Sequence, residues 1–106
     1  MRMMMKVGFP TDKANEAFRN GTFMKTMESF LASMKPEAVY FAEDNGERTG
    51  YIIFDMQDSS QLPAVAEPMF LAFNAKITVR PVMTPADLAQ AVPAIQASVQ
   101  AYGGTQ

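Results

Sequence analysis

The segment from residue 37 to residue 56, EAVYFAEDNGERTGYIIFDM, decides the fold of this 106-residue chain. Two runs rich in β-branched and aromatic residues, 37–44 and 48–56, flank the dipeptide Asn45-Gly46. This dipeptide between two such runs is the strongest short-range signal for a β-hairpin. The segment therefore predicts two antiparallel strands joined by a tight turn.

The residues before the hairpin predict one strand and one interrupted helix. Residues 3–9 alternate between apolar side chains on one face and mixed side chains on the other, as a half-buried strand does. Residues 13–34 have the apolar spacing of a helix, which Asn20-Gly21 splits or kinks. Lys35 precedes a proline and therefore resists the helical region, so the helix should end there.

The residues after the hairpin predict a helix and a fourth strand. Ser59 or Ser60 can cap this helix, and Pro63 falls within its first turn, where no backbone hydrogen bond is lost. Pro68 lies deeper and should kink or divide the helix. Residues 75–83 alternate as a strand, and the proline inside that run is typical of an edge strand or a strand end.

A terminal helix follows directly. Thr84 is the expected N-cap, Pro85 the first helical residue and Asp87 the third, which is the pattern of a capping box. The helix should run toward Tyr102, with a kink at Pro93.

The elements occur in the order β-α-β-β-α-β, with the terminal helix added. Right-handed crossovers and one tight hairpin give an α+β, ferredoxin-like antiparallel sheet with the strand order 4-1-3-2. We expect a single domain over residues 1–102, followed by a flexible tail at residues 103–106.

Composition excludes several classes of function. The chain has no histidine and no cysteine, so Ser-His-Asp catalysis, thiolate chemistry and zinc or haem sites built on these residues are excluded. The net charge is −2 and no block of Lys or Arg occurs, so nucleic acid is not an expected partner. No apolar run is long enough for a signal peptide or a membrane span, which predicts a soluble cytoplasmic protein.

Three consecutive methionines, Met3 to Met5, raise the question of a metal site. Successive side chains of a strand point to opposite faces, so these thioethers cannot all converge on one ion. Methionine is also a flexible core residue. We therefore expect core packing, no specific metal and no cofactor.

The alternation assigns each strand residue to one of two faces of the sheet. The apolar face, which should lie under the helices, comprises Met3, Met5, Val7, Val39, Phe41, Ile52, Phe54, Ile77 and Val79. The opposite face comprises Met4, Lys6, Tyr40, Tyr51, Ile53, Asp55, Thr78, Arg80 and Val82. No predicted helix is left to cover this mixed face, and a second copy of the chain would cover it, so we predict a homodimer.

Five residues of the mixed face are candidates for ligand binding: Lys6, Tyr40, Tyr51, Asp55 and Arg80. In one interpretation, Lys6, Asp55 and Arg80 form a structural ion network or are merely solvated at a strand end. In the other, the two cations receive an anionic ligand group and the two tyrosines supply walls and hydroxyls.

A second acidic cluster lies around the hairpin: Glu37, Glu43, Asp44 and Glu47. Its spacing does not match a calcium-binding loop, so we interpret it as a solvated turn and not as a cation site.

The whole chain resembles the small, dimeric α+β barrel superfamily, in an uncharacterised bacterial branch. The resemblance depends on the four strands, on the hairpin DNGERTGY (residues 44–51) and on VRPVMTPADL (residues 79–88). It implies two ferredoxin-like sheets packed face to face. That superfamily includes cofactor-free monooxygenases, isomerases, haem-handling enzymes and proteins with no known reaction.

Three functions follow as alternatives. The first is the binding of a small molecule, an anionic or aromatic metabolite, in a cavity of the dimer. The second is a cofactor-free monooxygenase or isomerase. The third is a structural or regulatory dimer module.

Overall fold

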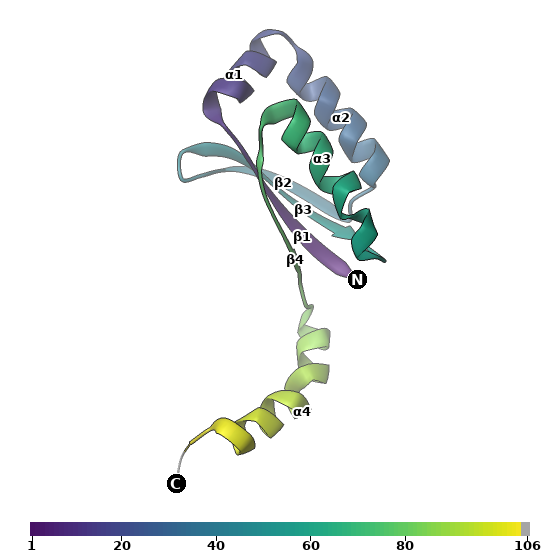
Figure 1. Ribbon diagram of the computed structural model, residues 1–106, viewed down its shortest axis with the longest axis vertical. Helices are drawn as coiled ribbons and strands as arrows, with labels where there is room; N and C mark the ends of the chain where they lie inside the picture. Colours follow the sequence, from purple (N-terminus) through teal and green to yellow (C-terminus); the bar gives the residue numbers. More distant parts are fainter. Residues whose placement is uncertain (105–106) are drawn as a thin grey trace.

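The computed structural model describes residues 1–104 of the chain. In chain order the elements are β1 (Arg2–Phe9), α1 (Thr11–Arg19), α2 (Thr22–Met34), β2 (Ala38–Asp44), β3 (Glu47–Asp55), the 3-10 turn η1 (Ser59–Gln61), α3 (Leu62–Phe73), β4 (Lys76–Pro81) and α4 (Pro85–Tyr102) (Figure 1). The strands form one antiparallel sheet in the order β2-β3-β1-β4, which is the predicted 4-1-3-2 read from the other edge. The α+β, ferredoxin-like prediction is confirmed.

The hairpin between β2 and β3 forms as predicted. Asn45 and Gly46 both have positive φ angles, 53° and 81°, as a two-residue turn of this hand requires. Asp44 consequently pairs with Glu47, and the register continues along both strands. This register fixes which face of the sheet each hairpin side chain occupies.

The predicted helix boundaries are mostly confirmed. The first helical segment is split into α1 and α2, with Gly21 between them at a φ of 77°. Lys35 ends α2 in the left-handed region. Thr84 and Asp87 form a reciprocal capping box at the start of α4, with N–O distances of 3.1 and 2.9 Å.

One prediction about α3 was wrong, and of the two outcomes expected at Pro68, a kink or a division, the division did not occur. Neither Ser59 nor Ser60 caps it, because both lie within η1; Asp58 caps this turn instead by accepting a hydrogen bond from the Ser60 amide at 3.1 Å. Pro68 does not divide α3, which is continuous. Pro68 lies on the exposed side of the helix, where water can bond the carbonyl group that the proline leaves free.

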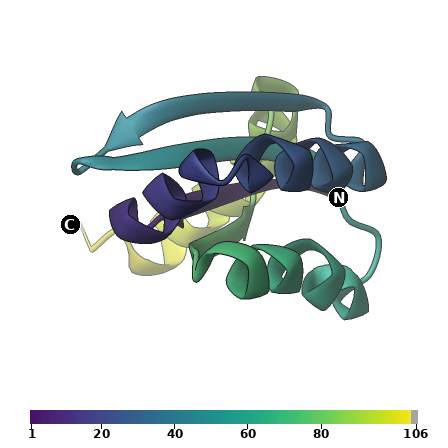
Figure 2. The same cartoon turned by 90° about the horizontal axis from the view of Figure 1, so that it is seen from above.

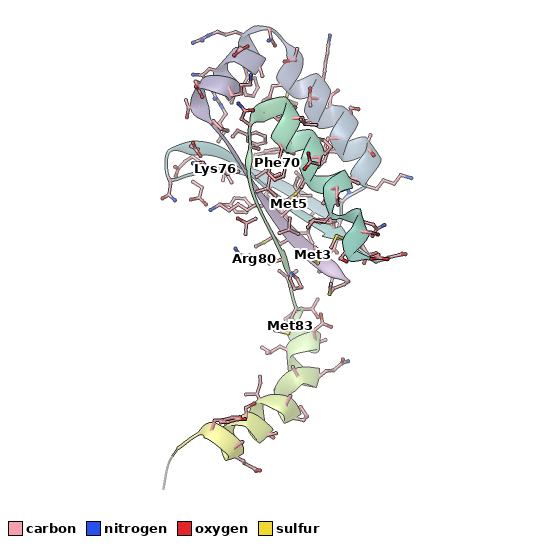
Figure 3. The ribbon with its side chains drawn as sticks, viewed as in Figure 1. Met3, Met5, Phe70, Lys76, Arg80 and Met83 are labelled. Carbon is pink, nitrogen blue, oxygen red and sulfur yellow. The ribbon has the colours of Figure 1, made fainter. Side chains whose placement is uncertain are left out.

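The core lies between the sheet and the helices α1, α2 and α3 (Figures 1 and 2). Met3 and Met5 point from β1 toward these helices, and each is at most 5% exposed (Figure 3). Met4 lies on the other face, as the alternation predicted. The methionine run is therefore a strand whose alternate residues are core.

One member of the predicted apolar face is not covered. Phe41 lies on the helix side of β2, but its side chain is 55% exposed. β2 is the outermost strand, and a gap separates it from α2 at this point. The sequence predicted correctly which face of the sheet Phe41 lies on, but the prediction that the helices cover it was wrong.

The terminal helix α4 leaves the rest of the molecule, in the direction in which β4 ends (Figure 1). It has no buried residue. A kink was predicted at Pro93, and the helix is curved along its length (Figure 1). The radius of gyration is 18.0 Å, whereas a compact chain of this length would have about 13 Å. Of the predicted flexible tail, Gly103 and Gly104 follow α4, and residues 105–106 lie outside the described residues.

Candidate functional site

The face of the sheet that no helix covers is called the open face here. By strand register it comprises Ala38, Tyr40, Ala42 and Asp44 of β2, Glu47, Thr49, Tyr51, Ile53 and Asp55 of β3, Arg2, Met4, Lys6 and Gly8 of β1, and Lys76, Thr78 and Arg80 of β4. Lys76 and Arg80 lie on the side of β4 away from the helices (Figure 3). All five candidate residues from the sequence are on this face.

Lys6, Asp44 and Tyr51 form a polar trio on the open face. The Lys6 Nζ atom lies 3.0 Å from Asp44 Oδ2, and the Tyr51 hydroxyl donates a hydrogen bond to the same oxygen. The Lys6 and Asp44 side chains are 40% and 26% exposed. The predicted partner of Lys6 was Asp55, and this prediction was wrong.

Contacts within the trio stabilise, in each of its three side chains, the protonation state that this side chain has at neutral pH. Hydrogen bonds from Tyr51 and then from Lys6 lower the pKa of Asp44. The hydrogen bond that Tyr51 donates to Asp44 raises the pKa of Tyr51, and burial raises it further. The Asp44 carboxylate also raises the pKa of Lys6. Asp44 is therefore a carboxylate, Tyr51 a phenol and Lys6 an ammonium ion.

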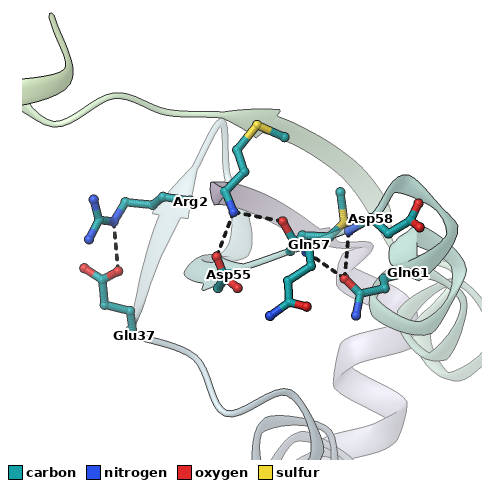
Figure 4. A network of polar contacts seen from close by, with 8 residues as sticks. Arg2, Glu37, Asp55, Gln57, Asp58 and Gln61 are labelled. Atoms are coloured by element: carbon teal, nitrogen blue, oxygen red, sulfur yellow. Dashed lines mark hydrogen bonds and ion pairs between the residues drawn. The ribbon is translucent and has the colours of Figure 1, made fainter. Parts of the chain in front are cut away.

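Asp55 belongs to a different polar network, at the end of the sheet where β1 begins (Figure 4). Its Oδ1 atom accepts a hydrogen bond from the amino group of Met1 at 2.8 Å, and the side chain is 66% exposed. Arg2 lies opposite Asp55 in the register but binds Glu37, with Nε to Oε1 at 2.9 Å. Asp55 lies four residues along β3 from Tyr51, which pairs with Lys6, and its carboxylate is bound by the amino group of Met1 instead.

A hollow of about 410 Å³ lies on the open face, and we call it the open-face hollow. It is lined by Lys6, Gly8, Asp44, Asn45, Glu47, Thr49, Lys76 and Thr78. Gly8 pairs with both Thr49 and Lys76 and has no side chain, which leaves space between the strands beside it. Of the predicted candidates, only Lys6 lines this hollow.

The edge strand β4 has two cations on the open face: Lys76, which lines the hollow, and Arg80, which does not. Lys76 and Arg80 form no ion pair within residues 1–104. Arg80 lies beside Met4, diagonal to Lys6, and its charge opposes the raised pKa of Lys6. Tyr40, on the other edge strand, is 67% exposed and pairs with Tyr51.

A second cavity, the α2–β2 groove, lies on the helix side and is also about 410 Å³ in volume. Its lining is mostly apolar: Phe9, Phe18, Phe23, Met24, Met27, Leu31 and Phe41, with Glu28, Ala42, Glu43, Arg48 and Thr49. The ring of Phe41 lies over Gly50, where an added Cβ atom would be 3.2 Å from Phe41 Cε1. At the rim, Arg48 stacks over Phe18 and donates a hydrogen bond to Asn15 at 2.9 Å.

Sequence reasoning missed Asp44 and the α2–β2 groove. Asp44 was counted among the acidic residues of a solvated hairpin, although counting by twos from Tyr40 places it on the open face. For the groove no comparable signal exists, because alternation predicts the face of Phe41 but not how far α2 extends over it.

Within residues 1–104, no helix has both the length and the apolar character that crossing a membrane requires. In the same part of the chain, no group of three or more acidic side chains is arranged to hold a metal ion.

The fold and the open face define a ferredoxin-like α+β domain with one charged, uncovered sheet face. The chain belongs to the DUF3303 family, a domain of unknown function whose model matches residues 1–96. No curated protein matches the sequence.

Among solved structures, a formyltetrahydrofolate deformylase from Pseudomonas putida KT2440 is similar, with a TM-score of 0.50 and 11% sequence identity. The match covers 96% of this chain but only 39% of the deformylase chain. At this identity the likeness shows the fold alone.

Proposed function

We propose that this protein binds a small anionic molecule with a planar or aromatic group, on the open face between two copies of the chain. The observation that supports this most is the pair of cations on β4, Lys76 and Arg80, which form no ion pair within residues 1–104. Cations in a partly covered site favour an anionic partner. The open-face hollow, at about 410 Å³, is within the range of small-molecule sites.

The other side chains of this face suit the rest of such a ligand. The charge of Lys6 is already balanced by Asp44. Lys6 can therefore donate a hydrogen bond that orients a ligand anion, but it contributes little to neutralising the charge of that anion. Tyr40 offers an exposed ring, and Met4 and Ile53 form an apolar strip between Arg80 and the tyrosines. A facing copy of the sheet would exclude water from this surface, which strengthens its electrostatic interactions.

Acid–base catalysis by the trio is a weaker alternative. An efficient general acid or base has a pKa near the working pH. In the trio the pKa of Asp44 is lowered while those of Tyr51 and Lys6 are raised, so each moves away from neutrality. These directions favour a binding surface and a structural ion network over a catalytic centre.

A thermal-shift screen with matched probes tests the proposal. The probes are benzoate, 4-hydroxybenzoate and inorganic phosphate, and benzamide serves as the neutral isostere of benzoate. A ligand that binds only the folded state raises Tm by mass action. We expect an aromatic carboxylate to raise Tm and benzamide to have no effect.

Three variants locate the binding. Arg80→Met and Lys6→Met each remove a charge and keep apolar bulk, so each should reduce the ligand-induced shift. Arg19→Met, an exposed position at the end of α1, should leave the shift unchanged. A screen in which no anion shifts Tm, or an Arg80→Met variant that keeps the full shift, would overturn the proposal.

A further inference from the structure

The helix α4 has one narrow apolar stripe that touches nothing in its own chain's core. Its members are Leu88, Val92, Ile95, Val99 and Tyr102, and their exposed fractions range from 38% at Val92 to 86% at Tyr102. At about 100° per residue, all five fall within about 80° of the helix circumference. An isolated helix of 18 residues with an internal proline is marginal in water. The stripe therefore needs a partner surface.

The spacing of the stripe identifies that surface as another helix. The intervals are 4, 3, 4 and 3 residues, which is the heptad repeat of a coiled-coil seam and not the broader stripe of a helix packed on a sheet. Val92 and Val99 occupy the a positions, and Leu88, Ile95 and Tyr102 the d positions. In parallel coiled coils, β-branched residues at a with leucine at d favour two helices; here valine occupies both a positions and leucine one of the three d positions.

We infer that α4 pairs with α4 of a second copy, in parallel, as a short two-stranded coiled coil. The occupant is the same helix, because the apolar stripes of α1, α2 and α3 are already packed in the core of their own chain. The e and g positions are Ala89, Ala91, Gln96 and Ser98, so no like charges oppose self-pairing. Pro93 falls at position b, which faces away from the partner helix.

Two other partners are disfavoured by the residues present. A membrane-surface helix usually has Lys or Arg on its polar face, and α4 contains neither. The α2–β2 groove of another copy could accept an apolar helix. Binding in that groove would not require the apolar residues to repeat every 3.5 residues, as they do in α4.

The same two-fold axis can relate both the helices and the sheets, and this deepens the proposed dimer. An axis parallel to the strands, between two facing open faces, brings both copies of α4 out at the same end and in the same direction, because α4 continues beyond β4 (Figure 1). Because β4 is an edge strand, the axis must pass toward the β4 edge of the sheet for the two α4 helices to come within the 8–10 Å of a helix pair. Two heptads are too few to hold two chains together alone, and the sheet contact would supply the rest.

Single-cysteine cross-linking tests this in a chain that has no cysteine of its own. Leu88→Cys places one thiol at the first d position, and Ala97→Cys places one at position f on the far side of the same helix. In the parallel pair, mild oxidation should convert most of the Leu88→Cys protein to a disulfide-linked dimer on a non-reducing gel. The Ala97→Cys protein should stay at the level of random collision.

The outcomes separate the alternatives. Equal cross-linking of both variants, or none for Leu88→Cys, would overturn the inference. A disulfide between Leu88→Cys and Tyr102→Cys proteins in a mixture, without one between two Leu88→Cys chains, would show an antiparallel pair and would also overturn it. Cross-linking needs no ligand. If the ligand screen fails but Leu88→Cys cross-links strongly, the proposed function is refuted and the pairing of α4 is not.

Discussion

At the scale of single residues, the trio of Lys6, Asp44 and Tyr51 shows how position along a strand decides the role of a charge. Asp44 and Asp55 are both at strand ends next to loops, and both lie on the open face. Asp44 contacts both Lys6 and Tyr51, whereas Asp55 contacts the amino group of Met1. Two carboxylates on the same face thus have different partners.

The lowered pKa of Asp44 predicts how stability depends on pH. A carboxylate whose pKa is lower in the folded state stabilises the fold above its unfolded pKa, and this contribution is lost as the pH falls through the folded value. Asp44→Asn should therefore have a lower Tm than the parent protein at pH 7. Below the ordinary value of 3.8 the difference should shrink as the parent protein itself loses the charge.

The control for this measurement is Glu67→Gln, which removes an exposed carboxylate of α3 that forms no ion pair within residues 1–104. Its Tm should follow that of the parent protein across the acid range. Thermal melts at several pH values would show both curves. A constant gap between Asp44→Asn and the parent protein from pH 7 to pH 2.5 would contradict the assigned role of Asp44.

At the scale of elements, the hairpin is the feature that sequence and structure share most fully. Gly46 has a φ of 81°, which costs an L-residue about 1–2 kcal/mol. Gly46→Ala should therefore reduce the free energy of unfolding by about that amount, measured by urea denaturation. No side chain crowds the site, since nothing lies within 4 Å of an added Cβ atom, so the backbone alone would account for the loss.

Gly8→Ala is the matched control for this prediction. Gly8 lies inside β1, and an added Cβ atom would meet its nearest neighbour, Glu47 Oε1, at an ordinary 3.6 Å. We expect a change within about 0.5 kcal/mol, as for most unstrained substitutions. A loss at Gly8 as large as that at Gly46 would show that the strained turn is not the cause.

The elements could be predicted where local chemistry determines them. Asn20-Gly21, Asn45-Gly46 and Thr84 each mark a boundary by their own backbone or capping preferences, and the structure confirms all three. Pro68 did not divide α3, because packing of the buried Ala66 and Met69 against the core outweighs one missing hydrogen bond. Local rules fail where tertiary contacts are stronger.

The candidate site was predicted only in part, for a related reason. The alternation of side chains placed Lys6, Tyr40, Tyr51 and Arg80 on the correct face. Such an assignment requires only that each strand, and the position of the residue along it, be known. It could not reveal that Lys6 binds Asp44, because that contact depends on how two strands are offset by the turn. The hollow beside Gly8 likewise depends on three strands at once.

At the scale of the whole molecule, two surfaces lack a partner in a single chain. The open face exposes Tyr40 and part of Ile53, and α4 exposes its apolar stripe. The radius of gyration of 18.0 Å is large for a chain of this length because α4 extends from the domain. The proposed two-fold pair would cover both surfaces.

The open-face dimer gives the last prediction, at Ile53. This residue lies on the open face between Ala38 of β2 and Met4 of β1, so a facing sheet would cover it. An aspartate there would stay hydrated in a monomer but would be buried without a partner in the dimer, at a cost of several kcal/mol. Multi-angle light scattering at micromolar concentration should give twice 11.7 kDa for the parent protein and 11.7 kDa for Ile53→Asp. Ile53→Val keeps the apolar surface and should stay dimeric, whereas a monomeric parent protein would refute the sheet-face dimer and leave the open face a solvent-exposed surface.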